Sequence, residues 1–398
     1  MKNPVIDVSD ENISSLARCI RLVSFAWLIC CASMTNSTSA WSADSIKIGA
    51  VLPFSGGVEL YGRQAKLGLE LAANEINAGG GILGRPVQVI YEDDKTDPAV
   101  AVDATRKLIE RDGVLAVVGP ITSRNLNAIA PVIESMRTPL LYATNYEGGQ
   151  CSRYIFSFST VPNQELAQLL PYMNRSFGNT YFLLGADRAW PHRMFEAAEP
   201  IISKLGGHVV GKEFTIGKET DFAPMIARIA ATKAKVLLFA LKGDGLNFIP
   251  QADDLGLLKD TRVAFLGLSE TDLGVFGGKG QNMFVAVPFV ATSDMPSVKA
   301  FVARARAEAS ADATVSNYVM THYNALIAMK AAIEKAGKVD KESMIDALER
   351  LMIKSPTGTV TIGKNHHATM NMFMAKTKGR DLVIVRALGQ IAPEPRCK

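Results

Sequence analysis

Small hydroxylic and aromatic side chains follow two successive apolar segments in the first half of the chain. Thr122 and Ser123 come after one apolar run, and Tyr142 and Thr144 come directly after the next. If both runs are strands of one parallel sheet, these side chains meet at its carboxyl edge, where open α/β sheets bind their ligands. Hydroxyls and unpaired N–H groups at a helix start bind a carboxylate or a carbonyl group. The stretch 119–149 therefore predicts one half of a small-molecule cleft.

Cationic and aromatic side chains follow strand-like segments in the second half of the chain. Arg188 and Trp190 come after one apolar run, and Lys242 comes after another. A cation beside a desolvated site favours an anionic ligand, and arginine can hold a carboxylate through two parallel hydrogen bonds. Tyr142 and Trp190 would enclose an apolar or planar ligand body. The hypothesis is a ligand with an exposed carboxylate, either an amino acid or an aromatic or aliphatic acid, rather than neutral urea.

Each of these side chains also has a purely structural interpretation. Arg188 would then be a solvated loop residue, and Trp190 would belong to a lobe core. Lys242 would pair with Asp244 or with Glu270. The sequence alone leaves both interpretations open.

The sequence does not predict catalysis, a metal site or a cofactor. The five histidines are scattered, and no G-x-S-x-G elbow accompanies them. The glycines of residues 79–84 match G-x-G-x-x-G, but they close a predicted helix instead of opening one, so a turn is expected there. The net charge of +4 is mild and no basic run occurs, which argues against a nucleic-acid partner.

The first forty residues have the pattern of a secretory signal peptide. Arg18 and Arg21 precede the apolar segment 22–32, and the small residues 37–40 follow it. This segment is too short to span a bilayer comfortably. We expect cleavage after about residue 40, which leaves an exported protein that does not itself span the membrane.

Two cysteines would remain after cleavage. Cys151 and Cys397 lie far apart in the sequence, and two cysteines in an exported chain invite a disulfide. The alternative is two free thiols, because spacing alone cannot place the two side chains together.

Apolar periodicity predicts an α/β protein in which strands and helices alternate, the pattern of parallel sheets covered on both faces. The expected strands are 45–54, 87–92, 114–118, 139–141, 153–159, 180–184, 209–214, 236–241, 264–268 and 283–289, followed by antiparallel strands at 359–362, 370–376 and 382–387. The expected helices are 61–77, 99–112, 125–135, 194–205, 222–232, 247–255, 297–309, 317–336 and 341–351. Two such series, with no low-complexity linker between them, indicate two similar domains.

Residues 46–387 resemble the type I periplasmic solute-binding proteins of ABC importers, the leucine-binding-protein-like superfamily. The segment that begins IKIGAVLPFSGG carries the general pattern. Five further motifs are similar to the amide- and urea-type branch: YEGG at 146–149, VPNQE at 161–165, GADRAWPHR at 185–193, SETD at 269–272 and PTGTVTIGKNHH at 356–367.

The resemblance implies two Rossmann-like lobes that close on a ligand and are joined by three crossover segments. The crossovers are expected near Thr160, Pro288 and Ser355, which gives a signal peptide at 1–40, lobe one at 44–160 plus 289–354, and lobe two at 161–288 plus 355–398. The implied partners are a small-molecule solute and the permease and ATPase subunits of an ABC transporter, and the implied location is the periplasm.

The branched-chain amino acid receptors of this superfamily suggest four site residues. Ser123 is retained from their run of hydroxylic residues, and Thr144 matches the threonine of their next loop. Lys242 stands near the position of their second-lobe tyrosine, which is a departure. Glu270 lies about one residue from their glutamate that faces the ligand ammonium.

The amide branch agrees with this chain in the first lobe and differs in the second. Its tyrosine and threonine match Tyr142 and Thr144. That branch has tyrosines at the positions of Arg188 and Trp190 in the second lobe. Arg188 is therefore a departure, and Trp190 keeps only the aromatic character.

These observations predict a periplasmic substrate-binding protein that captures a small amino acid or a related carboxylate or amide solute. The predicted ligand-binding residues are Ser55, Thr122, Ser123, Tyr142, Thr144, Arg188, Trp190, Lys242 and Glu270. The rival interpretation is a cytoplasmic amide-sensing regulator. Urea, short amides and aromatic acids stay open as ligand classes.

Overall fold

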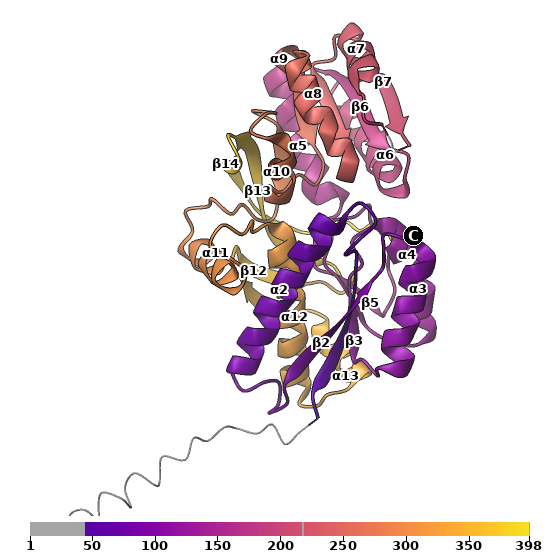
Figure 1. Ribbon diagram of the computed structural model, residues 1–398, viewed down its shortest axis with the longest axis vertical. Coiled ribbons are helices and arrows are strands. Elements are labelled where there is room, and N and C mark those ends of the chain that lie inside the picture. The colour runs from indigo at the N-terminus through magenta and orange to yellow at the C-terminus, as the bar shows by residue number, and fades with distance from the viewer. Residues whose placement is uncertain (1–43, 217–218, 398) are drawn as a thin grey trace, which may run out of the picture. The chain divides into compact units, whose positions relative to one another are not determined.

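Two β-sheets organise the described part of the chain, which comprises residues 44–216 and 219–397 of a computed structural model (Figure 1). The predicted signal peptide lies outside the described residues. Within the described ranges, no helix is long and apolar enough to cross a membrane. We refer to the part built on the five-stranded sheet as the first lobe and to the part built on the nine-stranded sheet as the second lobe.

The first sheet is entirely parallel, with strand order β2-β1-β3-β4-β5. Its strands are β1 (Ile46–Leu52), β2 (Val87–Asp93), β3 (Ala116–Val118), β4 (Leu140–Tyr142) and β5 (Ile155–Ser157). The helices around it are α2 (Glu59–Ala78), α3 (Pro98–Arg106, continued by a π-helical turn, Lys107–Arg111), α4 (Ser123–Ser135), α11 (Pro296–Glu308), α12 (Asn317–Ala336) and α13 (Lys341–Leu348).

Side-chain alternation along the strands builds a core on both faces of this sheet. Ile48 and Ala50 of β1 face the cluster formed with α2 and α12, which lie side by side. Val51, the residue after Ala50, faces the cluster formed with α3 and α4. Figure 1 shows these two helix pairs on opposite faces of the sheet. The predicted parallel α/β arrangement is confirmed.

The second sheet is mixed. Its order is β11-β12-β13-β10-β9-β8-β6-β7, with β14 paired to β13. Strands β6 to β10 are parallel, and the C-terminal strands are antiparallel as predicted. The strands are β6 (Thr180–Ala186), β7 (His208–Thr215), β8 (Val236–Ala240), β9 (Arg262–Phe265), β10 (Phe284–Val287), β11 (Met352–Ser355), β12 (Gly358–Ile362), β13 (Ala368–Lys378) and β14 (Asp381–Ile391). The helices are α5 (Pro162–Phe177), α6 (Ala189–Lys204), α7 (Ala223–Ala231), a 3-10 turn (Gly243–Asn247), α8 (Phe248–Asp254), α9 (Leu257–Asp260) and α10 (Glu270–Phe276).

The chain passes between the two sheets three times. It leaves the five-stranded sheet after β5, returns after β10 to form α11, α12 and α13, and joins the nine-stranded sheet again through β11. The predicted fold of two Rossmann-like lobes is confirmed in this architecture. The residue boundaries proposed for the lobes stay a prediction.

Three helical segments differ from the sequence prediction. Helix α5 was not among the expected helices; Pro162 lies at its first position, where proline is tolerated. Helix α10 was not among the expected helices either, although Ser269 and Asp272 form a capping box at its start. Helix α6 begins five residues earlier than expected, so Trp190 lies in its first turn.

The C-terminal segment is fixed against the first lobe. Cys151 and Cys397 form a disulfide with a Cα–Cα distance of 5.7 Å. The Gly149 N–H donates to the Pro395 carbonyl at 2.7 Å, and Figure 1 shows the chain end beside α4. Gly148 has a φ of +81°, and a Cβ there would lie 2.4 Å from the Pro395 oxygen, so only glycine suits this close approach.

Candidate ligand-binding cavity

A cavity of about 220 Å³ lies at the carboxyl ends of the parallel strands of both sheets. Its lining comes from the loops after β1, β2, β3 and β4 in the first lobe and after β6, β7 and β8 in the second. Tyr61 of α2 and Tyr318 of α12 complete it. Ligand pockets usually measure roughly 300–1,000 Å³, so this cavity suits a solute of few heavy atoms.

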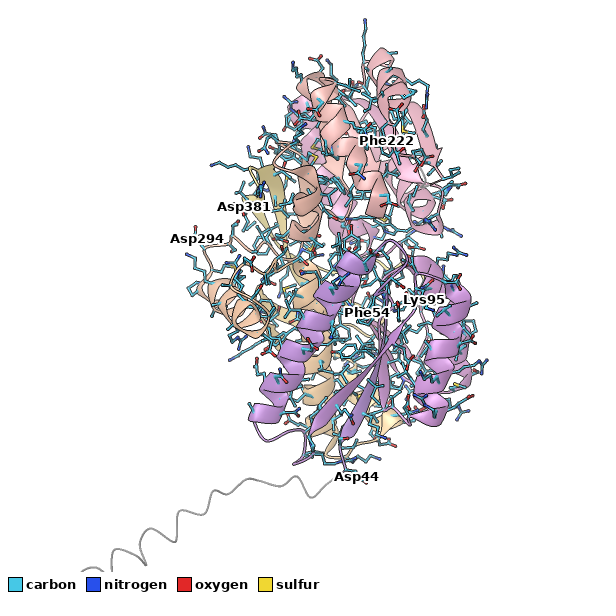
Figure 2. All side chains as sticks on the ribbon, in the orientation of Figure 1. Asp44, Phe54, Lys95, Phe222, Asp294 and Asp381 are labelled. Atoms are coloured by element: carbon cyan, nitrogen blue, oxygen red, sulfur yellow. A yellow bond between two sulfur atoms is a disulfide. The ribbon has the colours of Figure 1, made fainter. Side chains whose placement is uncertain are left out.

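The loops after β1 and β2 are held together at the edge of the first sheet. Asp93 of β2 accepts hydrogen bonds from the backbone N–H groups of Phe54 (2.8 Å) and Lys95 (2.9 Å), and Figure 2 labels both of these residues. The predicted ligand residue Ser55 donates to Asp93 at 2.7 Å and does not line the cavity. Gly56 lines it instead.

Helix α4 presents its N-terminus to the cavity. Thr122 is the N-cap residue, and its Oγ1 accepts from the Asn125 N–H at 3.3 Å, which leaves the hydroxyl hydrogen free to donate. The N–H groups of Ser123 and Arg124 have no acceptor among the described residues, as expected for the first turn of a helix. Thr122, Ser123 and Arg124 all line the cavity.

The side chain of Ser123 is already engaged in the protein. It donates to Glu147 at 2.6 Å, and burial raises the pKa of that carboxyl. Thr144 is freer, because its hydroxyl lies 3.5 Å from the Pro120 carbonyl, a long contact. The first lobe therefore offers Thr122, Thr144 and backbone N–H groups as donors.

Tyr142 does not lie where the sequence predicted. The strand β4 includes this residue, whereas the predicted strand ended at Leu141. Side chains alternate along a strand, so Tyr142 points into the core shared with α4, where it is fully buried. Its hydroxyl donates to the Ile121 carbonyl at 3.3 Å. It does not line the cavity, and it cannot enclose a ligand with Trp190.

Glu270 is also absent from the cavity lining. It lies in the first turn of α10, where its side chain is half-buried and accepts a hydrogen bond from the Ala291 N–H at 2.7 Å. The carboxylate that pairs with the cavity-lining residue Lys242 is instead that of Asp272, two positions later in the same helix.

Replacing Glu270 with glutamine is expected to raise stability more at about pH 8 than at about pH 5. Burial raises the pKa of Glu270 to about 7, whereas an unfolded glutamate has a pKa near ~4.3. Its contribution to stability is therefore complete below about pH 4.3 and is lost as the pH rises through about 7, by up to about 4 kcal/mol.

Urea unfolding of E270Q and of the wild-type protein at both pH values measures this effect. The exposed residue Glu110, changed to glutamine, is the matched control. A stability difference between E270Q and wild type that does not change with pH would show that Glu270 ionises normally.

Lys242 lines the cavity, but its charge is compensated from within the second lobe. Its Nζ lies 2.9 Å from Oδ2 of Asp272 and donates to the Gly267 carbonyl at 2.6 Å. Asp272 has no exposed surface and also accepts hydrogen bonds from Tyr61 and Ser269. The expected structural partners of Lys242, Asp244 and Glu270, are not used.

Two arginines that line the cavity have no carboxylate partner among the described residues. Arg188 is the N-cap residue of α6 and is exposed, and Arg124 is exposed in the first turn of α4. One comes from each lobe. Asp244 is the carboxylate residue in the cavity lining, within the described ranges, and it is exposed. Arg124 was not among the predicted ligand-binding residues.

Aromatic rings supply the apolar part of the lining. Trp190 is half-buried, and its Nε1 has no acceptor among the described residues. Burial raises the pKa of Tyr61 and of Tyr318 well above the usual range, so both phenols are neutral. The hydroxyl of Tyr318 has no described protein partner. Both tyrosines escaped sequence reasoning because they lie on helices rather than on strand-end loops.

The described residues offer no metal centre. Nowhere in 44–216 and 219–397 do three or more His, Cys, Asp or Glu side chains gather so that they could hold a metal ion. What the cavity can do chemically is bind: it combines cations, hydroxyls and helix N–H donors with aromatic surfaces.

Comparison with known proteins defines the family. The family profile described as periplasmic binding protein matches residues 45–381, and the chain belongs to this family. The resemblance to type I periplasmic binding proteins of ABC transporters is thereby confirmed.

Individual relatives agree with this assignment. The chain is 28% identical over 337 residues to the Leu/Ile/Val-binding protein BraC3 of Rhizobium johnstonii, a match that covers 82% of this chain and 90% of the relative. Two solved solute-binding proteins from R. palustris have the same fold. One, in complex with benzoate, superposes with a TM-score of 0.80 at 19% identity and covers 89% of this chain and 99% of its own. The other, in complex with 4-hydroxybenzoate, superposes with a TM-score of 0.79 at 23% identity. That match covers 88% of this chain and 98% of the other protein.

Proposed function

We propose that this protein captures a small organic acid that carries one carboxylate and no ammonium group. The observation that carries this proposal is the charge of the cavity wall. Arg124 and Arg188 have no carboxylate partner within the part of the chain that the structure describes, whereas Lys242 is compensated by Asp272. An anionic ligand supplies the charge that these arginines lack, through hydrogen bonds that are charge-assisted.

A zwitterionic amino acid fits this wall less well. Its ammonium would need a buried carboxylate or several acceptors in order to leave water. Asp272 already has its full set of partners, and Glu270 lies away from the cavity. The exposed Asp244 is a weak partner because it stays in water.

The shape of the ligand follows from the aromatic lining. Tyr61, Tyr318 and Trp190 present flat apolar surfaces in a cavity of about 220 Å³, which favours a planar or compact body. The relatives include a branched-chain amino acid receptor and two proteins solved with benzoate and 4-hydroxybenzoate. The wall chemistry favours the acid ligands of the latter kind over an amino acid.

We further propose export to the periplasm and delivery of the solute to an ABC permease and its ATPase. The support is the family, the signal pattern of residues 1–40 and a disulfide that suits an oxidising compartment. N-terminal sequencing of the protein from a periplasmic extract should give a start near residues 41–44. An intact N-terminus on protein recovered from the cytoplasm would favour the sensor alternative.

Replacing Arg188 with glutamine is expected to weaken carboxylate binding about 10- to 100-fold. A charge-assisted hydrogen bond contributes roughly 1.5–3 kcal/mol, and each 1.4 kcal/mol corresponds to a factor of about ten. Isothermal titration with benzoate measures the change.

The matched control is R193Q, because Arg193 lies on the same helix, outside the cavity lining. We expect R193Q to bind as the wild type does. If R188Q binds benzoate as tightly as the wild-type protein does, Arg188 does not bind the ligand carboxylate.

A further inference from the structure

The ammonium of Lys242 lies in a complete cage. Its Nζ contacts Oδ2 of Asp272 at 2.9 Å and the Gly267 carbonyl at 2.6 Å. The ring centroids of Tyr61 and Phe265 each lie 5.2 Å from the same nitrogen. A carboxylate, a carbonyl and two aromatic faces are the groups that recognise a primary ammonium ion.

This cage adjoins the ligand cavity, because Lys242 and Tyr61 belong to both. Lys242 lines the cavity wall, and its side chain keeps 18% of its surface exposed. The lysine side chain therefore belongs both to the cavity wall and to the cage. Removal of the side chain would join the cage to the cavity and leave the buried carboxylate of Asp272 without its cation.

We propose that the cage is an ammonium-binding subsite that the protein fills with its own lysine. Lys242 is then a specificity-determining residue: it occupies the place of a ligand ammonium and so excludes amino acids in favour of acids that lack the amino group. The second half of this statement rests on the proposed function, whereas the existence of the subsite does not.

An experiment can distinguish an ammonium-binding subsite from an ion pair that only stabilises the fold. An ion pair that serves only stability predicts damage when the lysine is removed, whatever is added to the solution. A subsite predicts that a free amine of matching size enters the vacated space. Replacing lysine by alanine deletes three methylene groups and the ammonium, so n-propylammonium matches the missing atoms.

The test measures the melting temperature of K242A with n-propylammonium chloride against sodium chloride at equal ionic strength. At about ten times the dissociation constant, bound amine should raise the melting temperature by about 2 °C. The wild-type protein should not respond, because its cage is filled. K242M should not respond either, because methionine fills the same space without a charge.

A second control removes the anion that would attract the amine. The double variant K242A/D272N should lose the response to n-propylammonium. The proposal is overturned if K242A gives no response, or if K242M or the double variant responds as strongly. If K242A folds only when the amine is present, that result supports the subsite, and failure to fold in either salt contradicts it.

Amino acids provide a test in the unmodified protein. Titration with leucine and with 4-methylpentanoate compares ligands that differ only in the amino group. The wild-type protein should bind the acid at least tenfold more tightly, and K242A should narrow or reverse that preference. Equal wild-type affinities would overturn the specificity role. If neither ligand nor benzoate binds while n-propylammonium still stabilises K242A, the subsite stands and the proposed solute class is wrong.

Discussion

The variant D272A is expected to lose about 3–5 kcal/mol of the free energy of unfolding, because removal of one partner leaves a buried charge uncompensated. Asp272 has no exposed surface and accepts hydrogen bonds from Lys242, Ser269 and Tyr61. The lysine would lose its anion, and the start of α10 would lose its capping box. Equilibrium unfolding in urea measures the loss.

The exposed pair of Asp254 and Lys279 provides the control. Its carboxylate is 60% exposed, so D254A should cost at most about 1 kcal/mol. The double variant K242A/D272A should be less damaged than the sum of the two single variants, because both members of the pair are removed together. A D272A protein as stable as D254A would contradict the description of Asp272 as a buried anchor.

The double variant C151S/C397S is expected to lose about 4 kcal/mol of stability. The disulfide joins residues separated by 246 positions. Closing such a long loop removes conformational entropy from the unfolded chain, which is worth about 5–6 kcal/mol in the chain-entropy description, whereas removal of a native disulfide typically costs about 2–5 kcal/mol. Thermal unfolding in the presence and absence of a thiol reductant measures the effect.

The reductant provides its own control for the serine substitutions. Reduced wild-type protein should unfold near the temperature of C151S/C397S, and the variant should be insensitive to the reductant. The bonded C-terminal segment also contacts the loop at Gly149, four residues after the cavity residue Asn145. Identical melting temperatures for oxidised and reduced wild-type protein would mean that the bridge contributes nothing to folding stability.

Much of the first lobe could be predicted from the sequence because local signals there agree with the final structure. The apolar runs around Thr122 and Thr144 have strand length, and the intervening segment has helical spacing, so both threonines could be placed at the cavity. In the second lobe, Arg188, Trp190 and Lys242 follow strands and line the cavity for the same reason.

The remaining site residues depend on details that the sequence does not fix. Tyr142 was placed in the loop after the strand, but β4 extends to this residue. Side chains alternate along a strand, so the ring of Tyr142 points into the core shared with α4. Asp272 was missed because α10 is short and was not among the expected helices. Tyr318 belongs to a helix far along the chain, and only tertiary packing brings it to the cavity.

The central claim is that the cavity selects a small carboxylate through unpaired arginines. Isothermal titration of the exported form with benzoate, benzamide and leucine tests it most directly, because benzamide keeps the ring and lacks the charge, and leucine adds an ammonium. We predict binding of benzoate with at least tenfold weaker binding of the other two. Tighter binding of benzamide or leucine than of benzoate would contradict the claim.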